Sequence, residues 1–313
     1  MALTLKELCT QPDKLSPGHR ACAGCGEPII VRQVLHAIDA PVVVAAPTGC
    51  LEIFTSPYPY TSWRVPWIHN AFENSSTTLA GAETAYRSLV KQGKIPDKGL
   101  KFVVFGGDGA TYDIGLQWLS GVVERGHRLL YICLNNEAYM NTGIQRSSAT
   151  PIGTWTTTSP VGSAIPGKVQ HRKDLTAIMV AHDIPYAAQA APHAWRDLML
   201  KVQRAIAVDG PSFINVLSPC PRGWRHDSDQ AIALTRLAAQ TCMWPLYEAT
   251  DGASWKLSYK PSPKRPVTDW LASQGRFAHL LRPENKHLVE ALQERVDRDW
   301  KRLLERCGVA EAE

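Results

Sequence analysis

The residues with the most chemical potential in this sequence are four cysteines that stand beside small residues. Cys22 and Cys25 form a CxxC pair within ACAGCGE, Cys50 closes the segment PTGC, and Cys220 lies within SPCP. Such thiolates can bind zinc, form a redox-active pair or hold part of an iron–sulfur cluster. A compact zinc site usually has a second CxxC or a His pair nearby, and none follows here. The spacing favours a cluster over zinc but leaves zinc, or neither, open.

The other four cysteines show no ligand pattern. Cys133 lies in an apolar segment and is expected in the core, whereas Cys9, Cys242 and Cys307 stand alone. The sequence has eight cysteines in total. In a chain expected in the cytoplasm, this number indicates metal or cluster ligation before disulfide bonding.

A second group of polar residues follows two apolar segments. Gly107-Asp108-Gly109-Ala110 comes after 101–106, and Asn135-Asn136-Glu137 comes after 129–134. Backbone N–H groups of a glycine-rich turn suit phosphate oxygens, while Asp108 and Asn136 offer the hard oxygens that Mg²⁺ prefers. A lone GDG is often only a turn. Together with the Asn pair it resembles the thiamine diphosphate motif and predicts a magnesium-bound diphosphate.

The elements that must position these residues have an α/β pattern. Short runs at 41–46, 101–106, 129–134 and 213–217 are almost continuously apolar, which is typical of parallel strands covered on both faces. Helical segments are expected between them, for example at 75–92 and 112–125. If the strands are parallel, Cys50, Asp108, Asn136 and Cys220 all follow strands at one edge of the sheet.

Two segments differ from this pattern. Residues 150–173 are rich in Thr, Ser, Pro and Gly and predict a long ordered loop. After residue 244, a Pro- and Lys-rich stretch at 258–266 and an amphipathic helix at 284–306 predict an extended arm and a helix. We therefore expect a cofactor-binding domain at 1–244 and a C-terminal region at 245–313 that contacts other subunits.

The composition excludes several classes of protein. Hydrophobic residues make up 44% of the chain and charged residues 20%, so a globular core is expected. The net charge of +5 comes without a block of like charges, so we expect no nucleic-acid partner. No leader is visible at 1–17 and no apolar run is long enough to span a membrane, so we expect a cytoplasmic protein.

The motifs in combination resemble one known family. The chain is similar to the β subunit of pyruvate:ferredoxin oxidoreductase and other 2-oxoacid:ferredoxin oxidoreductases, oxalate oxidoreductase included. The resemblance covers almost the whole chain, and it rests on the segments 21–27, 47–50, 58–74, 106–110, 137–151 and 219–224. It implies the thiamine diphosphate-binding fold, a mostly parallel sheet with helices on both faces.

The resemblance also implies roles for individual residues. Cys22, Cys25, Cys50 and Cys220 would ligate one [4Fe–4S] cluster. Asp108, Asn136 and the carbonyl of Ala138 would hold Mg²⁺, and Asn141 would lie beside the thiazolium ring and the substrate as the catalytic residue. The remaining cofactor contacts implied are Gly49, Gly107, Gly109, Ala110 and Met140. The carboxylate that activates the cofactor would come from a neighbouring α subunit, although Glu52 and Glu73 are possible cofactor neighbours.

The implied function is oxidative decarboxylation of a small 2-oxo acid with electrons passed to ferredoxin. The implied partners are α, γ and/or δ subunits, and coenzyme A if pyruvate is the substrate. Oxalate, which needs no coenzyme A, is an alternative substrate. A non-redox thiamine decarboxylase with a structural zinc, and a non-catalytic scaffold subunit, are alternatives from other classes; the intact Asp108 and Asn136 argue against the scaffold.

Overall fold

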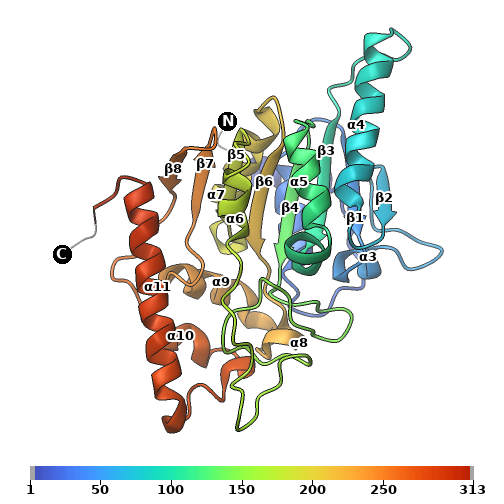
Figure 1. Ribbon diagram of the computed structural model, residues 1–313. Coiled ribbons are helices and arrows are strands. Elements are labelled where there is room, and N and C mark those ends of the chain that lie inside the picture. The colour runs from blue at the N-terminus through green and yellow to red at the C-terminus, as the bar shows by residue number, and fades with distance from the viewer. Residues whose placement is uncertain (1–3, 311–313) are drawn as a thin grey trace.

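The computed structural model describes residues 4–310, and its centre is one eight-stranded sheet with the order β2-β1-β3-β4-β6-β5-β7-β8 (Figure 1). The first six strands in that order are parallel, β7 is antiparallel to β5, and β8 is antiparallel to β7. The strands are β1 (Val42–Pro47), β2 (Trp67–Asn70), β3 (Lys101–Gly107), β4 (Leu130–Asn135), β5 (Tyr186–Ala190), β6 (Ser212–Leu217), β7 (Tyr247–Thr250) and β8 (Ser254–Leu257).

Helices cover both faces of this sheet, as the sequence predicts. One face packs against α2 (Glu27–His36) and α7 (Trp195–Ala207), and the other against α4 (Ser75–Lys91), α5 (Leu116–Glu124) and α6 (Leu175–Val180). Within β3, Val103 and Phe105 point to the first face while Phe102 and Val104 point to the second, because successive side chains alternate. This two-sided burial explains why the strand sequences are continuously apolar.

The predicted strands at 41–46, 101–106, 129–134 and 213–217 correspond to β1, β3, β4 and β6 within about one residue. The helix expected at 112–125 is divided. A π-helix, Gly109–Ile114, follows β3 directly, and α5 begins only at Leu116. The shorter elements are α1 (Leu5–Leu8), α3 (Cys50–Thr55), α8 (Pro221–Trp224), and the 3₁₀ turns Pro192–Ala194, Ser228–Gln230, Gly275–Phe277 and Pro283–Asn285.

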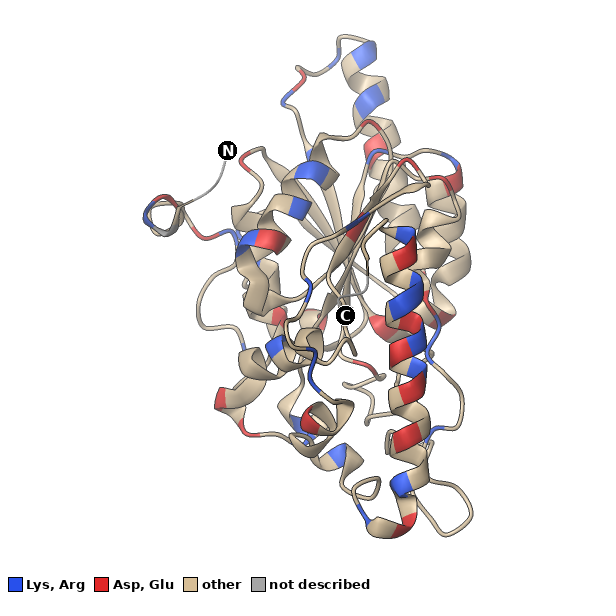
Figure 2. Cartoon of the chain, turned by 90° about the vertical axis from the view of Figure 1, so that its left-hand side faces the viewer, with Lys and Arg blue, Asp and Glu red and all other residues tan. Residues whose placement is uncertain are grey.

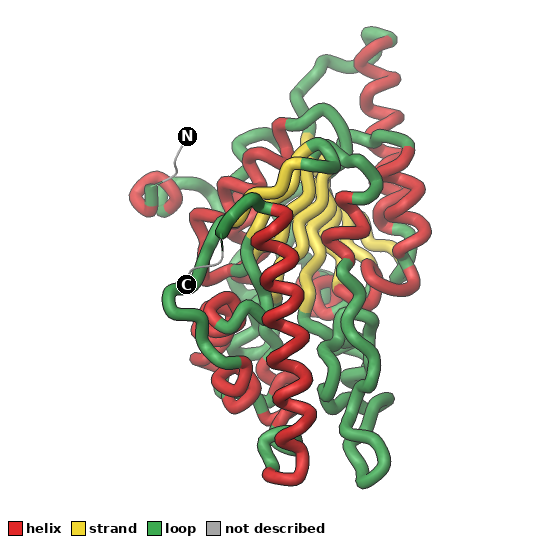
Figure 3. The backbone as a smooth tube through the Cα atoms, turned by 60° about the vertical axis from the view of Figure 1, so that its left-hand side comes forward, coloured by secondary structure: helices red, strands yellow, loops and turns green. Residues whose placement is uncertain are grey.

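Residues 150–173 form a loop, also as predicted, and it lies with other loops at one end of the sheet (Figure 3). Backbone hydrogen bonds order it: the N–H of Gly153 donates to Lys168 O at 2.7 Å, and that of Lys173 donates to Ser148 O at 2.9 Å. Lys168 itself is buried, and its Nζ donates to Thr150 O at 2.5 Å. The loop is therefore ordered by its own hydrogen bonds.

The helices that follow β6 form a third layer beside the sheet. Helices α9 (Ala231–Gln240), α10 (Val267–Ala272) and α11 (Lys286–Arg306) pack around buried Trp224, Trp244 and Trp270. Strands β7 and β8 extend the main sheet, which the expected arm after residue 244 did not include. The boundary at 244 remains a prediction. Within residues 4–310, no helix is long and apolar enough to cross a bilayer.

Candidate active site

The loops that follow β1, β3 and β4 enclose a cleft at the carboxyl end of these strands. Every residue expected to contact the cofactor lines it. They are Gly49, Gly107, Asp108, Gly109, Ala110, Asn136, Ala138, Met140 and Asn141, with Cys50 beside them. Parallel strands bring their carboxyl ends to one edge, so residues far apart in the sequence meet here. The cleft has about 450 Å³ of empty space open to solvent.

Asp108 is a fully buried carboxylate at the base of this cleft. Its Oδ1 accepts the backbone N–H of Asn136 at 3.3 Å, and its Oδ2 accepts a short hydrogen bond from Ser147 Oγ. Burial raises the pKa of Asp108 to about 8, although the hydrogen bond from Ser147 opposes the rise. A carboxyl group that is held here without a neighbouring cation is unfavourable as an anion, so the position suits a carboxylate that a metal ion neutralises.

Asn136 presents an unpaired oxygen to the same region. Its Nδ2 donates to Glu27 Oε1 at 3.1 Å, which fixes the orientation of the amide. Its Oδ1 is buried without a hydrogen-bond partner among the described residues, and so is Oε2 of Glu27. Burial raises the pKa of Glu27 to about 7. Buried polar oxygens without partners are rare in folded proteins and indicate a group that would pair with them.

The glycines that line the cleft differ in the space beside them. A Cβ at Gly109 would lie 2.3 Å from the ring of Tyr139, so only glycine fits there. At Gly49 and Gly107 a Cβ would meet nothing within 4 Å, although both residues line the cleft. Carboxylate, amide and carbonyl oxygens beside this space are the ligands that Mg²⁺ takes, and Mg²⁺ in turn binds the oxygens of a diphosphate. The residues present therefore fit thiamine diphosphate with Mg²⁺.

The loops that carry the cysteines are packed against one another. The N–H of Gly26 donates to Pro219 O at 3.1 Å, which joins the CxxC loop to the loop of Cys220. At Gly24, where φ is +78°, a Cβ would lie 2.3 Å from the backbone oxygen of Ser228. Small residues in the CxxC pair thus permit the contact that brings the N-terminal thiols to the end of β6.

Cys25, Cys50 and Cys220 are partly buried, whereas Cys22 is exposed. Burial, followed by the charge of Glu27 and then Cys220, raises the pKa of the Cys50 thiol; a hydrogen bond with Asn141 opposes this. Burial likewise raises the pKa of Cys25 and Cys220, and the neighbours that contribute include Cys50 for the former and Cys22 for the latter.

One of these sulfurs accepts a hydrogen bond from the backbone. Cys220 Sγ accepts the N–H of Gly223 at 3.4 Å. Across residues 4–310, no three Cys, His, Asp or Glu side chains are grouped closely enough to hold a single metal ion. Thiols and backbone amides that donate to sulfur are the groups that an iron–sulfur cluster takes, although the side chains of the four cysteines do not converge on one point in this structure.

Glu137 fixes the turn that carries Asn136 and Ala138. It has a φ of 67°, which is uncommon for a residue with a side chain. Its carboxylate accepts from Arg172 Nη1 at 3.1 Å and from Arg276 Nη2 at 2.5 Å. Arg276 is buried over the ring of Trp224, with Cζ 4.2 Å from its centroid. Arg172 and Arg276 thereby hold the turn that carries Asn136 and Ala138 in place.

Sequence reasoning missed Glu27, Ser147 and Arg276. Glu27 had a readable signal, because it stands two residues after Cys25 and is the first residue of α2. The two acidic residues that were considered as cofactor neighbours, Glu52 and Glu73, are not among the residues that line the cleft. Glu52 instead accepts a hydrogen bond from Ser56 Oγ at 3.1 Å, a local contact within α3.

Comparison with known proteins gives a consistent result. Residues 47–216 match the family of the thiamine pyrophosphate enzyme, C-terminal TPP binding domain. The pyruvate synthase subunit PorB of Thermotoga maritima is 51% identical, over 97% of this chain and 96% of that protein. PorB of Methanocaldococcus jannaschii is 48% identical (92% and 95% covered), and the ketoisovalerate oxidoreductase subunit VorB of Pyrococcus abyssi is 42% identical (91% of each).

Among solved structures, 2-oxoglutarate:ferredoxin oxidoreductase from Magnetococcus marinus matches with a TM-score of 0.56 and 20% identity, covering 72% of this chain and 79% of that one, which supports the fold. The chain belongs to the thiamine pyrophosphate enzymes and, among them, to the β subunits of the 2-oxoacid:ferredoxin oxidoreductases. The family and fold expected from the sequence are thus confirmed.

Proposed function

We propose that this subunit binds thiamine diphosphate, Mg²⁺ and one [4Fe–4S] cluster, and serves the oxidative decarboxylation of pyruvate with ferredoxin as electron acceptor. The observation that carries the proposal is the single cleft in which all nine expected cofactor contacts meet, with Cys50 at its border. Bound thiamine diphosphate supplies a carbon nucleophile and an electron sink, and an iron–sulfur cluster accepts single electrons.

The residues of the cleft have separate tasks in this proposal. Asp108, Asn136 Oδ1 and the carbonyl of Ala138 hold Mg²⁺ and, through it, the diphosphate. Glu27 orients the amide of Asn136 so that its oxygen, rather than its nitrogen, faces the metal. The absence of a side chain at Gly107 lets the diphosphate approach the backbone.

The cysteine site adjoins this arrangement through Asn141. Cys22, Cys25, Cys50 and Cys220 are the cluster ligands in our proposal, and the contact between Cys50 and Asn141 joins them to the cleft. Asn141 is the residue we assign beside the thiazolium ring and substrate. The short path between the two sites would allow electrons to leave without a swinging arm.

Partner subunits complete the enzyme in this proposal. We assign the carboxylate that activates the cofactor to an α subunit, because neither Glu52 nor Glu73 lines the cleft and Glu27, which does line it, is bonded to the amide of Asn136. Further clusters in γ or δ subunits would carry electrons to ferredoxin.

Two assays on the anaerobically purified native complex test the proposal. Metal analysis should find iron with acid-labile sulfide, and replacement Cys50→Ser should remove the cluster together with substrate-dependent dye reduction. Dye reduction that survived loss of the cluster would contradict the electron route, and a single zinc would support a non-redox thiamine enzyme instead.

Substrate choice needs its own assay because the relatives differ. Two are named for pyruvate synthase and one for ketoisovalerate oxidoreductase. Activity that requires pyruvate and coenzyme A together would support our proposal. Higher activity with a branched 2-oxo acid than with pyruvate would show that pyruvate is not the substrate. Activity with oxalate in the absence of coenzyme A would show the same.

A further inference from the structure

Residues 147–150 form a buried turn that contacts the proposed metal site from outside the cleft. The N–H of Thr150 donates to Ser147 O at 3.3 Å, which closes the turn, and both side chains are buried. Neither residue lines the cleft, whereas the proposed Mg²⁺ ligands do. The turn can therefore act on the metal site only through the bonds that it makes to neighbouring residues.

The hydroxyl of Ser147 has one proton, and its surroundings assign that proton to Asp108. Ser147 Oγ accepts the N–H of Ala149 at 3.2 Å and is hydrogen-bonded to Asp108 Oδ2. An ionised carboxylate can only accept, so Ser147 is the donor in this bond. The second oxygen of Asp108 accepts the N–H of Asn136 at 3.3 Å. Two donors from different loops thus hold the carboxylate in one orientation.

Thr150 extends the same turn to the end of β4. Its Oγ1 donates to Glu137 O at 2.6 Å and accepts the N–H of Ser147 at 3.0 Å. Thr150 Oγ1 also lies 3.4 Å from Ser147 Oγ, but a charged carboxylate binds a hydroxyl proton more strongly than a neutral oxygen does. The turn therefore joins the loop after β3 to the loop after β4, and these two loops carry the proposed ligands of Mg²⁺.

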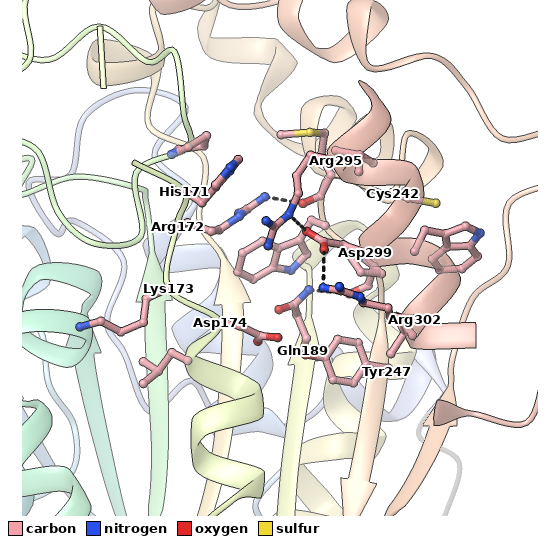
Figure 4. A pocket seen from close by; sticks show the side chains of 18 of the residues that line it. His171, Arg172, Lys173, Asp174, Gln189, Cys242, Tyr247, Arg295, Asp299 and Arg302 are labelled. Atoms are coloured by element: carbon pink, nitrogen blue, oxygen red, sulfur yellow. Dashed lines mark hydrogen bonds and ion pairs between the residues drawn. The ribbon is translucent and has the colours of Figure 1, made fainter. Parts of the chain in front are cut away.

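The next residue makes the same kind of bond to a different carboxylate. Ser148 Oγ donates to Asp113 Oδ1, and the N–H of Ser148 donates to Asp113 Oδ2 at 3.0 Å. Asp113 also pairs with Lys173 at 4.0 Å, and Figure 4 shows Lys173 directed away from α11. Asp113 does not line the cleft. The two serines are a matched pair, of which only Ser147 bonds to a proposed metal ligand.

We propose that Ser147 is a positioning residue for Mg²⁺: it orients the Asp108 carboxylate from outside the cleft, and Thr150 holds Ser147 in place. This inference rests on the proposed function, in which Asp108 binds the metal. Hydrogen bonds to a ligating carboxylate fix its direction, and their loss typically weakens metal binding by about ten- to hundredfold. If the turn served only the fold, Ser147 and Ser148 would affect Mg²⁺ equally.

The test follows the binding of thiamine diphosphate to the native complex, freed of cofactor and metal, as the Mg²⁺ concentration is varied. Quenching of tryptophan fluorescence reports binding. Ser147→Ala should raise the Mg²⁺ concentration for half-maximal binding by about tenfold or more. Ser148→Ala, which removes the matched bond to Asp113, should leave that concentration unchanged. Equal Mg²⁺ requirements in the two variants would overturn the proposal.

A double-mutant cycle shows whether Ser147 acts through Asp108. In an Asp108→Asn background the carboxylate is absent, so Ser147→Ala should change the Mg²⁺ requirement much less than it does in the wild type. Fully additive effects would contradict a positioning role. Glu305→Gln is the control for the loss of one negative charge. It lies at an exposed site on α11, which carries both signs of charge along its length (Figure 2), and should leave the Mg²⁺ requirement unchanged.

Two variants of Thr150 keep the test decisive if Ser147→Ala does not fold. Thr150→Ser retains the hydroxyl and should need no more Mg²⁺ than the wild type. Thr150→Val is close to threonine in shape but loses the bond to Glu137 O, so it should need more. Equal requirements in these two variants would exclude the turn from positioning the metal.

The outcomes separate this inference from the proposed function. An unchanged Mg²⁺ requirement in Asp108→Asn would overturn both, because Asp108 would then not be a ligand. A raised requirement in Asp108→Asn together with a wild-type requirement in Ser147→Ala would overturn only the role of Ser147.

Discussion

Arg276 and Glu137 form an ion pair in which both side chains are almost completely buried. Arg276 Nη2 lies 2.5 Å from Glu137 Oε2, and each side chain is 1% exposed. The pair joins the C-terminal layer to the turn that carries Asn136, the proposed ligand of Mg²⁺. A buried pair of this kind costs desolvation, but the loss of one partner leaves an uncompensated charge.

Replacement Arg276→Met should therefore lower the free energy of unfolding by about 3 kcal/mol. Arg172 remains as a partner of Glu137, which keeps the loss from being larger. Urea unfolding followed by tryptophan fluorescence measures it. Arg265→Gln is the control, since its pair with Asp269 is solvent-exposed and should change stability by about 0.5 kcal/mol or less. Equal effects of the two variants would show that the buried pair does not hold the turn.

Asp108→Asn should weaken the Mg²⁺-dependent binding of thiamine diphosphate by about tenfold or more, because a neutral amide is a poorer ligand than a carboxylate. The fold should persist, since the amide is nearly isosteric. Quenching of tryptophan fluorescence by the cofactor gives the affinity. Asp209→Asn provides the control, because Asp209 is an exposed partner of Arg128. Undiminished affinity in Asp108→Asn would remove Asp108 from the metal site.

The glycines of the motif make opposite predictions for stability. Gly109→Ala places a Cβ 2.3 Å from the Tyr139 ring and should destabilise the protein by about 1–3 kcal/mol. Gly107→Ala meets nothing within 4 Å, so it should fold normally but bind cofactor less tightly. Thermal unfolding with and without thiamine diphosphate separates the two. Normal cofactor binding by Gly107→Ala would mean that the diphosphate does not approach this residue.

His193 should make the protein less stable in acid. Burial, and then the charge of Arg236, lowers its pKa to about 4, below the usual value of about 6.5. Between pH 4 and pH 6.5 the unfolded chain binds a proton that the folded chain does not. The protein therefore keeps this part of its stability above pH 6.5 and loses it as the pH falls to 4. The loss should be about 2 kcal/mol, allowing for partial exposure. His193→Gln should flatten this part of the stability–pH curve, while His287→Gln, at an exposed site, should not. A curve unchanged by His193→Gln would exclude this histidine as the cause.

The sequence predicts the central strands well because each is buried on both faces. It misses the others for physical reasons. Strand β2 is short and half-exposed at the sheet edge, and β5 (YAAQA) is rich in alanine, which has little preference for strands. In β8, exposed and partly buried residues alternate over four positions only, too few for a clear period.

The residues of the candidate site also fall into a predicted group and a missed group. Asp108 and Asn136 stand in local motifs, so their types and spacing were enough to place them in one cleft. Glu27 reaches Asn136 from 109 residues away in the sequence, and Arg276 reaches Glu137 from 139 residues away. Such contacts depend on packing between layers, which no local pattern records. The roles of the cysteines and of Asn141 remain predictions.

The contact between the CxxC loop and the loop of Cys220 has a consequence for biogenesis. Cys22 and Cys25 precede β1 and Cys220 follows β6, so the CxxC loop and the loop of Cys220 meet only after β6 has entered the sheet and Gly26 has bonded to Pro219. A nascent chain emerging from the ribosome cannot present the complete set. A prosthetic group that requires all four thiols would therefore be inserted only after β6 has been synthesised. Its insertion would require that β6 has already taken its place in the sheet.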